Sequence, residues 1–521
     1  MKLPLRAART PLAALACGML GACGFQPLAL WPLALLGMAG LIALVAAAPG
    51  WKGAGWIGWA WGVGHFTIGN NWIATAFTYQ AKMPPWLGGL AVLGLSLYLA
   101  LFPALSAIAA RLLPRRSPTG FALAFAGCWI VGEWLRGWVC TGFPWNPLAV
   151  VALGPFARPG LAALAPWLGT YALSGLMVLL AACWWQALAR RRADWQTLAL
   201  IALPIALLLP GRGPRPLTQG TIPFTLVQPD IEQAAVNDPT RFEEQFIKTA
   251  RLSRPAVVGQ RRLVLWPESG VPDYLREGYP PEFYAYATYA GDPVLARWRL
   301  ARAIGPDSLL LTGTEDLELA GKQATGARNV VTALDGQGRI VASYAKAHLV
   351  PYGEYLPMRG LLEPLGIARL VPGDIDMLPG PGPQTLNFGA LGKAGIQLCY
   401  EIVFSGQVVD RAHRPDYIFN PTNDGWFGAW GPPQHLAQAR LRAIEEGLPI
   451  LRATTNGISA VIAADGVVVH SIPGHQAGRI DGMIPPAHAP TLFARLGNML
   501  PLCWAAVLLV LALVANRRRS G

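Results

Sequence analysis

The stretch GKAGIQLCYEIVF, residues 392–404, carries an apolar run that ends on Cys399 and is followed by Tyr400 and Glu401. A short apolar run that begins after a glycine is typical of a strand buried in a sheet. Cys399 is the only cysteine between residues 211 and 494, so it has no disulfide partner within that segment. Its position alone leaves two interpretations open: a small core residue, or a free thiol used for chemistry.

The segment around this stretch, residues 211–494, alternates short apolar runs with amphipathic helical patterns. The turns LDGQGR and AADGV predict hairpins between neighbouring strands. Together these patterns predict a mixed α/β domain with two layers of sheet and helices outside. Strands are expected at 222–228, 262–267, 308–313, 329–335, 339–346, 394–399, 416–422, 449–455 and 458–465, and helices at 239–254, 281–304 and 433–446.

Three polar residues stand where expected buried strands end: Glu268, Lys346 and Cys399. Strand ends at one edge of a sheet are places where catalytic groups collect, because the sheet fixes their positions. Each residue alone has an ordinary explanation as a helix cap, a solvated charge or a core cysteine. Together they suit acyl transfer, with the thiol as nucleophile, the carboxylate as general base and the ammonium stabilising negative charge.

The rest of the chain is too apolar for a purely soluble protein. Of 521 residues, 53% are hydrophobic and 14% are charged, against about 25% charged in soluble proteins. The apolar residues crowd into a region before residue 211 and a stretch near the C-terminus. We expect a transmembrane domain of seven helices over 1–210, a catalytic domain over 211–494, and a last transmembrane helix with a cytoplasmic tail over 495–521. The expected spans are 10–24, 26–48, 54–76, 86–112, 118–137, 161–187, 195–210 and 495–516.

The basic residues predict the orientation of these spans. Most of them fall on one side of the membrane if the chain crosses eight times, which places both termini in the cytoplasm and residues 211–494 outside. The net charge of +13 is then mainly an anchoring asymmetry, so it gives no sign of nucleic-acid binding. The basic residues expected on the cytoplasmic side are Lys2, Arg6, Arg9, Lys52, Arg111, Arg115, Arg116, Arg190, Arg191, Arg192, Arg517, Arg518 and Arg519. Those expected in short loops on the other side are Lys82, Arg136 and Arg158.

Several motifs resemble a known family. WPESG at 266–270, YAKAHLVPYGEYLP at 344–357 and LCYE at 398–401 resemble the catalytic motifs of the nitrilase (carbon–nitrogen hydrolase) superfamily. This resemblance implies an αββα sandwich with a Glu268–Lys346–Cys399 triad. EWLRGWVCTGFPW at 133–145 and the flanking spans extend the resemblance, over nearly the whole chain, to the apolipoprotein N-acyltransferases.

The resemblance implies a two-step reaction. An acyl chain, typically the sn-1 chain of phosphatidylethanolamine, passes to Cys399 as a thioester and then to the N-terminal amine of a diacylglyceryl-cysteine lipoprotein, with ping-pong kinetics. It implies no cofactor and no metal. We expect a monomer in the bacterial inner membrane, with its catalytic domain in the periplasm.

Supporting roles follow from the same motifs. Lys346, with the backbone N–H of Tyr400, is expected to stabilise the tetrahedral oxyanion. Glu354 is expected to orient Lys346 or Glu268, or else to form a structural salt bridge. Glu401 is expected to brace the loop after the nucleophile, or else to be a solvated charge.

Aromatic and basic residues near the outer face suggest contacts with lipid. Trp426 and Phe427, with Leu361, Leu362 and Trp430, are expected to gate lipid entry. Trp138 and Trp145 are expected to line the lipid path, or to form an interfacial aromatic belt. Arg136 is expected to contact a phosphate or to extend towards the membrane surface. His435, Arg440 and Arg442 are expected to form a structural ion-pair network.

Two other functions stay open from the residues alone. A membrane-tethered amidase or nitrile hydrolase would use the same thiol, with water resolving the thioester. A transporter with a large outer domain is a third possibility, but charged residues deep within the expected spans are sparse.

Overall fold

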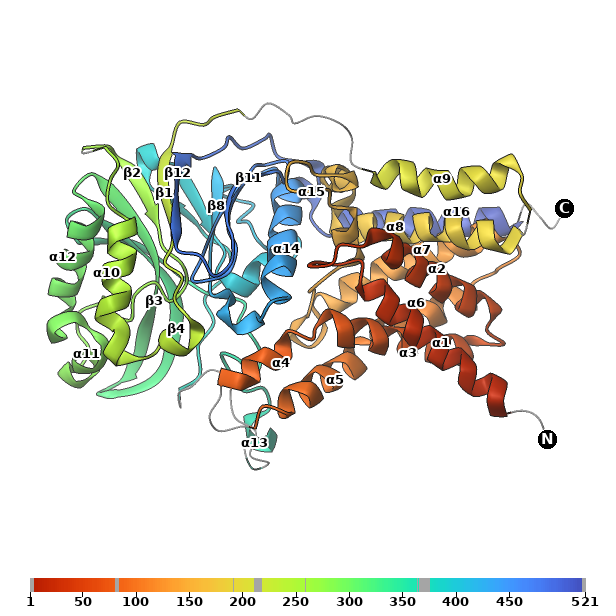
Figure 1. Cartoon of the computed structure of the whole chain (residues 1–521), viewed down its shortest axis with the longest axis horizontal. Coiled ribbons are helices and arrows are strands. Elements are labelled where there is room, and N and C mark those ends of the chain that lie inside the picture. The colour runs from red at the N-terminus through yellow and green to blue at the C-terminus, as the bar shows by residue number, and fades with distance from the viewer. Residues whose placement is uncertain are drawn as a thin grey trace.

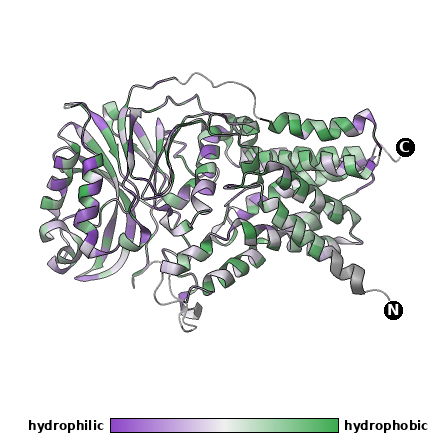
Figure 2. Cartoon of the chain, in the orientation of Figure 1, coloured by the Kyte–Doolittle hydropathy of each residue, from purple (hydrophilic) through white to green (hydrophobic). Residues whose placement is uncertain are grey.

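The computed structural model describes residues 4–79, 84–190, 192–209, 218–257, 259–362, 364 and 375–517. A bundle of helices occupies one end of the molecule and an α/β sandwich the other (Figure 1). The chain ends on a helix that returns to the bundle and packs against α7 and α8. Hydrophobic residues concentrate in the helical end (Figure 2), as the sequence predicts.

All eight expected spans contain helix. Span 86–112 consists of two helices that meet at Ala100, and 54–76 contains most of α3 and all of α4. The helices are α1 (Pro4–Ala22), α2 (Trp31–Ala47), α3 (Trp51–Gly69), α4 (Ile73–Ala76), α5 (Leu87–Leu99), α6 (Leu101–Leu112), α7 (Pro118–Arg136), α8 (Ala165–Arg190), α9 (Trp195–Leu208) and α16 (Met499–Arg517).

Among the described residues, three helical stretches are long and apolar enough to cross a membrane: Leu87–Leu112, Leu161–Arg190 and Met499–Arg517. Shorter apolar helices lie at Thr10–Ala22, Trp31–Ala47 and Trp195–Leu208. The full arrangement of eight spans and its orientation stay predictions. Of the basic residues behind the orientation, Lys2, Lys82, Arg191, Arg518 and Arg519 lie outside the described residues.

Glycines let α1 and α3 approach each other closely. A Cβ on Gly18 of α1 would lie 1.9 Å from the carbonyl oxygen of Trp61 in α3. A Cβ on Gly64 of α3 would lie 2.2 Å from the carbonyl oxygen of Leu15. Both distances are far below van der Waals contact, so glycine at these positions is what brings α1 and α3 together.

The second part confirms the predicted sandwich. One six-stranded sheet has the order β12-β1-β2-β3-β4-β5 and the other β11-β10-β9-β8-β7-β6. Apolar side chains from both inner faces, such as Leu265 and Phe419, form the core between the sheets. The strands are β1 (Pro223–Gln228), β2 (Arg262–Leu265), β3 (Ser308–Ala320), β4 (Gln323–Asp335), β5 (Ile340–Ala345), β6 (Thr385–Asn387), β7 (Lys393–Ile396), β8 (Tyr417–Thr422), β9 (Ile450–Thr454), β10 (Ser459–Ile462), β11 (Val468–Ile472) and β12 (Gly478–Met483).

Helices cover the outer faces of both sheets (Figure 1). On the first sheet these are α10 (Phe242–Leu252), α11 (Pro281–Ala287) and α12 (Pro293–Ile304); on the second it is α14 (Gly431–Glu446). The single helix expected at 281–304 is wrong. Gly291 has a φ of 68°, and Asp292 begins a new helix by accepting hydrogen bonds from the N–H groups of Val294 and Leu295.

The sandwich is docked on the bundle through α14. The carboxylate of Glu445 accepts hydrogen bonds from the Thr170 N–H (2.5 Å) and the Ser405 hydroxyl (2.9 Å), and it pairs with Arg442 (2.7 Å). Arg440 donates to the backbone carbonyls of Gly154, Pro155 and Arg158. These buried contacts give Arg440 and Arg442 a structural role at the interface, and they hold the loop after Cys399 against the helices.

Candidate active site

Topology brings the three expected strand-end residues to one place. Strands β1, β2 and β3 are parallel, and β4 reverses direction, so β5 ends at the same edge as β2. Glu268 follows β2 and Lys346 follows β5, while Cys399 follows β7 of the facing sheet. The Lys346 ammonium nitrogen lies 3.6 Å from Glu268 Oε1, and the charges of Glu268 and Lys346 both act on the pKa of the Cys399 thiol. All three side chains are buried.

Glu268 is held in place by two further hydrogen bonds. Its Oε1 accepts from the side-chain amide of Asn329 (2.7 Å), and its Oε2 accepts from the backbone N–H of Asn423 (2.8 Å). One donor comes from each sheet. The carboxylate is therefore oriented before any substrate binds.

Glu354 lies against Lys346. The Lys346 ammonium donates to Glu354 Oε1 (2.8 Å), and Glu354 Oε2 accepts from the Val350 N–H (2.8 Å). Asn329 also donates to Glu354 Oε1 (3.1 Å), so one amide bridges both carboxylates. Sequence reasoning missed Asn329, because it lies inside β4 rather than at a strand end.

The charges around the lysine keep it protonated. Burial by itself lowers the pKa of Lys346, but the negative charges of Glu354 and Glu268 outweigh burial and raise it. The site therefore keeps a fixed positive charge close to the thiol. Such a charge is positioned to stabilise an anion that forms during a reaction.

The thiol is protonated at rest. Burial and the charge of Glu268 raise the pKa of Cys399 well above its usual value, and the opposing effect of Lys346 is smaller. A neutral thiol is a weak nucleophile, so a reaction at this sulfur would need a base to accept its proton, and the Glu268 carboxylate is the candidate base.

The candidate nucleophile, Cys399, lies on a strained turn. Cys399 has a φ of 51°, in the left-handed region that a residue with a side chain rarely adopts. Buried Glu401 ties this turn to the end of β5: it accepts hydrogen bonds from the N–H groups of Leu398 (2.8 Å), Ala347 (2.7 Å) and His348 (3.1 Å). Glu401 is thus not solvated, and burial raises its pKa to about 7 despite these hydrogen bonds.

His435 lies against the backbone of Cys399. Its Nε2 is 3.1 Å from the carbonyl oxygen of Cys399. Its Nδ1 is 3.0 Å from both Asp424 Oδ1 and the Arg452 guanidinium, and Arg452 also pairs with Asp424 (2.7 Å). Burial and the charge of Arg452 lower the pKa of His435 to about 4, so the ring is neutral. Sequence reasoning missed Arg452 and Asp424.

The residues expected to contact lipid lie in different environments. Phe427 and Trp145 are buried, 5.7 Å apart between ring centres, in an aromatic cluster with Trp72. Trp426 is partly exposed against Tyr79, and Trp138 is 51% exposed. The Leu361 and Leu362 side chains lie outside the described residues.

Arg136 is 2% exposed, and its guanidinium donates to the backbone carbonyls of Phe143 (2.8 Å) and Trp145 (2.7 Å). This arrangement favours a structural role for Arg136, while the expected phosphate contact stays a prediction.

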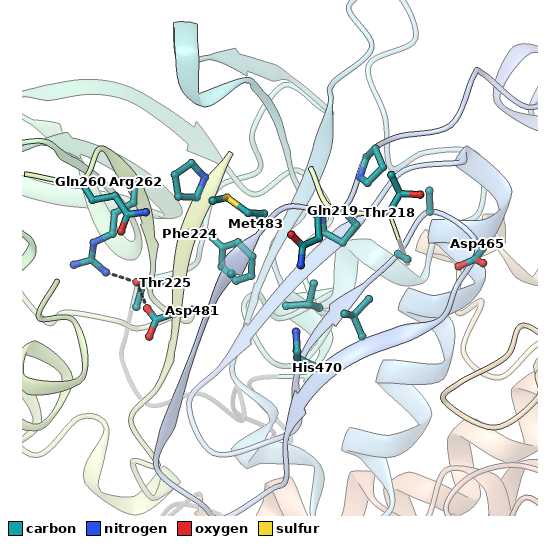
Figure 3. A pocket seen from close by; sticks show the side chains of 18 of the residues that line it. Thr218, Gln219, Phe224, Thr225, Gln260, Arg262, Asp465, His470, Asp481 and Met483 are labelled. Carbon is teal, nitrogen blue, oxygen red and sulfur yellow. Dashed lines mark hydrogen bonds between the residues drawn. The ribbon is translucent and has the colours of Figure 1, made fainter. Parts of the chain in front are cut away.

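A cavity of about 630 Å³ lies away from these residues, between the β1–β12 and β10–β11 edges of the two sheets (Figure 3). Arg262, Thr225 and Asp481 are hydrogen-bonded to one another on its wall. Neither the thiol nor its partners line it. Within the described part of the chain, no group of three His, Cys, Asp or Glu side chains is arranged to hold a metal ion.

Comparisons with known proteins match both parts of the chain. Residues 17–183 match the family model described as apolipoprotein N-acyltransferase N-terminal domain, and residues 225–486 match the one described as carbon-nitrogen hydrolase. The apolipoprotein N-acyltransferase of Bradyrhizobium diazoefficiens is 35% identical over 98% of this chain and 95% of its own. That of Caulobacter vibrioides is 34% identical over 98% of this chain and 95% of its own.

Among solved structures, an amidase of the nitrilase superfamily from Nesterenkonia AN1 is 20% identical, covers 52% of this chain and 93% of its own, and has a TM-score of 0.35. The two family models and the full-length relatives place the chain in one family.

Proposed function

The chain belongs to the apolipoprotein N-acyltransferase family, and from this premise we propose that it moves an acyl chain from a phospholipid to the N-terminal amine of a diacylated lipoprotein through a thioester on Cys399. The observation that carries the mechanism is the convergence of a thiol, a carboxylate and an ammonium in one buried site. Burial and the Glu268 carboxylate raise the pKa of the Cys399 thiol, and Lys346 lies 3.6 Å from that carboxylate.

In the first half-reaction the thiol attacks the ester carbonyl of the phospholipid. Glu268 accepts the thiol proton while the C–S bond forms, and Lys346 stabilises the oxyanion together with the Tyr400 N–H. The intermediate collapses, the ester C–O bond breaks, and Glu268 returns the proton to the leaving oxygen. The products are a thioester on Cys399 and a lysophospholipid.

In the second half-reaction the α-amine of the lipoprotein attacks the thioester. Glu268 takes a proton from the amine, an amide bond forms, and the C–S bond breaks with return of a proton to the sulfur. The result is a triacylated lipoprotein and the free enzyme. Because the first product leaves before the acceptor reacts, the kinetics are ping-pong.

Burial of the site supports a lipid ester as donor. Cys399 is 5% exposed, and its surroundings include aromatic side chains at the junction with the helical bundle. An acyl chain held there is kept from water, which favours transfer to an amine over hydrolysis. We propose the sn-1 chain of phosphatidylethanolamine as donor, a periplasmic catalytic domain, and cytoplasmic termini.

Replacement of the sulfur tests the proposal. Full-length Cys399→Ser protein is incubated with phospholipid vesicles and a diacylated lipopeptide, and triacylated product is measured by mass spectrometry. We expect loss of the third acyl group. Cys503→Ser, a change at an exposed cysteine on α16, is the matched control and should retain activity. Wild-type product from Cys399→Ser would overturn the proposal.

A further inference from the structure

A loop of the helical bundle lies directly behind the nucleophile. The Tyr400 hydroxyl donates to the carbonyl of Gly142 (3.4 Å). The ring of Trp145 lies 5.1 Å from that of His435, whose Nε2 is 3.1 Å from the Cys399 carbonyl oxygen. Residues 142–145 therefore contact Tyr400 directly and are connected to Cys399 through His435, although they precede Cys399 by some 250 positions in the chain.

The same loop is fastened to the neighbouring helix, α14. The indole N–H of Trp145 donates to the side chain of Gln434 (2.8 Å), which precedes His435. Trp145 is fully buried, and Phe427 packs against both its ring and that of His435. Because these buried side chains are closely packed, a displacement of Trp145 would also displace His435.

The backbone before this loop is strained. Cys140 and Thr141 have φ values of 51° and 77°, which residues other than glycine rarely adopt. A conformation of this kind persists only where its surroundings hold it. The end of α7 supplies that restraint through one cationic and one anionic side chain.

Arg136 is the cationic half of this restraint. Its guanidinium donates to the carbonyls of Phe143 (2.8 Å) and Trp145 (2.7 Å), and its own carbonyl accepts from the Phe143 N–H (2.8 Å). One turn earlier, Glu133 accepts from the N–H of Leu148 (2.9 Å). Residues 143–148 are thus held at both ends by α7.

We propose that Arg136 is a positioning residue for Cys399: it fixes the loop at residues 142–145, which in turn sets the backbone of the nucleophile through His435 and Tyr400. The guanidinium is occupied by backbone carbonyls and buried, so it is not presented to a lipid phosphate. This inference rests on the proposed function, in which Cys399 is the acylated residue.

The test measures the reactivity of Cys399 with a small soluble electrophile. Full-length protein in detergent micelles is treated with iodoacetamide, and the peptide that contains Cys399 is followed by mass spectrometry, because six other cysteines are present. The variant is Arg136→Lys, which keeps the charge but loses the forked donor. Arg111→Lys is the matched control, since Arg111 also donates twice to a backbone carbonyl, that of Ala48, at another place in the bundle.

We expect Arg136→Lys to slow alkylation of Cys399 and to lower kcat by about tenfold or more, with an unchanged KM for phospholipid and wild-type behaviour of Arg111→Lys. A wild-type alkylation rate with a raised KM would overturn the proposal in favour of a phosphate contact. Wild-type values throughout would also overturn it.

If Arg136→Lys does not fold, as judged by its melting temperature, Trp145→Phe takes its place. This variant keeps an aromatic ring against His435 but loses the hydrogen bond to Gln434. The same slowing is expected, and a wild-type rate would overturn the proposal. If the wild type alkylates faster than the variants but forms no thioester with phospholipid, the proposed function fails while the positioning role stands.

Discussion

Replacing Glu354 by glutamine should disable the site without removing any of its three reacting groups. Both oxygens of Glu354 accept hydrogen bonds: Oε1 from Lys346 and Asn329, and Oε2 from the Val350 N–H. An amide has one acceptor oxygen, so in either orientation its NH₂ group meets a donor. Lys346 also loses one of the two carboxylates that pair with it inside the protein.

The size of the effect follows from these contacts. A hydrogen bond to a charged group contributes about 1.5–3 kcal/mol, and breaking a buried ion pair costs about 3–5 kcal/mol. Because Glu268 still faces the lysine, we expect the lower end, a loss of about 3 kcal/mol in the free energy of unfolding. If the misplaced ammonium loses about 2–3 kcal/mol of transition-state stabilisation, acylation slows by about 30- to 160-fold.

Single-turnover formation of the acyl-enzyme from phospholipid is the assay, with melting temperature as the measure of stability. Glu318→Gln is the matched control, because Glu318 pairs with Arg328 (2.6 Å) at the surface, where such pairs contribute at most about 1 kcal/mol. Since Glu354 helps to raise the pKa of Lys346, Glu354→Gln should also lose activity at a lower alkaline pH than the wild type. Wild-type acylation together with a wild-type melting temperature would refute this account of Glu354.

Three further outcomes are expected. Because burial raises the pKa of Cys399, its alkylation by iodoacetamide should rise with pH beyond the usual thiol range, and a rate that is already level at neutral pH would contradict a protonated resting thiol. Burial raises the pKa of Glu401 from 4.5 to about 7, so between these values the folded protein keeps a proton that the unfolded chain has lost. The stability of the wild type relative to Glu401→Gln should therefore fall as pH rises through this interval. Melting temperatures of both proteins at about pH 5 and about pH 8 check this, and a difference that does not change with pH would argue against it. Trp426→Ser should reduce acylation from phospholipid vesicles while Cys399 keeps its reactivity towards iodoacetamide, and a loss of both would show that Trp426 supports the site rather than gating lipid entry.

The sequence predicts Glu268, Lys346 and Cys399 as candidates because each follows a strand. Strands β2 and β5 run in the same direction within one sheet, so Glu268 and Lys346 lie at the same edge, and the facing sheet brings Cys399 to it. Asn329 escapes this reasoning, because its position between Glu268 and Glu354 depends on the pairing of β4 with β3 and β5. No local pattern distinguishes it from the other residues of β4.

The aromatic residues show a different limit. Trp138 and Trp145 stand in the same motif, yet one is 51% exposed and the other fully buried. The difference arises because α14, which lies far along the chain, packs over Trp145. Hydropathy reports that a residue is apolar, but it does not say whether lipid or another domain covers it. Arg136 shows a further limit, because its partners are the backbone carbonyls of Phe143 and Trp145, and hydropathy does not predict such contacts.

The central claim is that Cys399 carries the acyl group. The most direct measurement is incubation of the full-length protein with phosphatidylethanolamine labelled in its sn-1 chain, followed by identification of the labelled peptide. The account predicts label on Cys399 as a thioester that hydroxylamine releases, transfer of that label to a diacylated lipopeptide, and none in Cys399→Ser. Label on another residue, or transfer without any covalent intermediate, would contradict it.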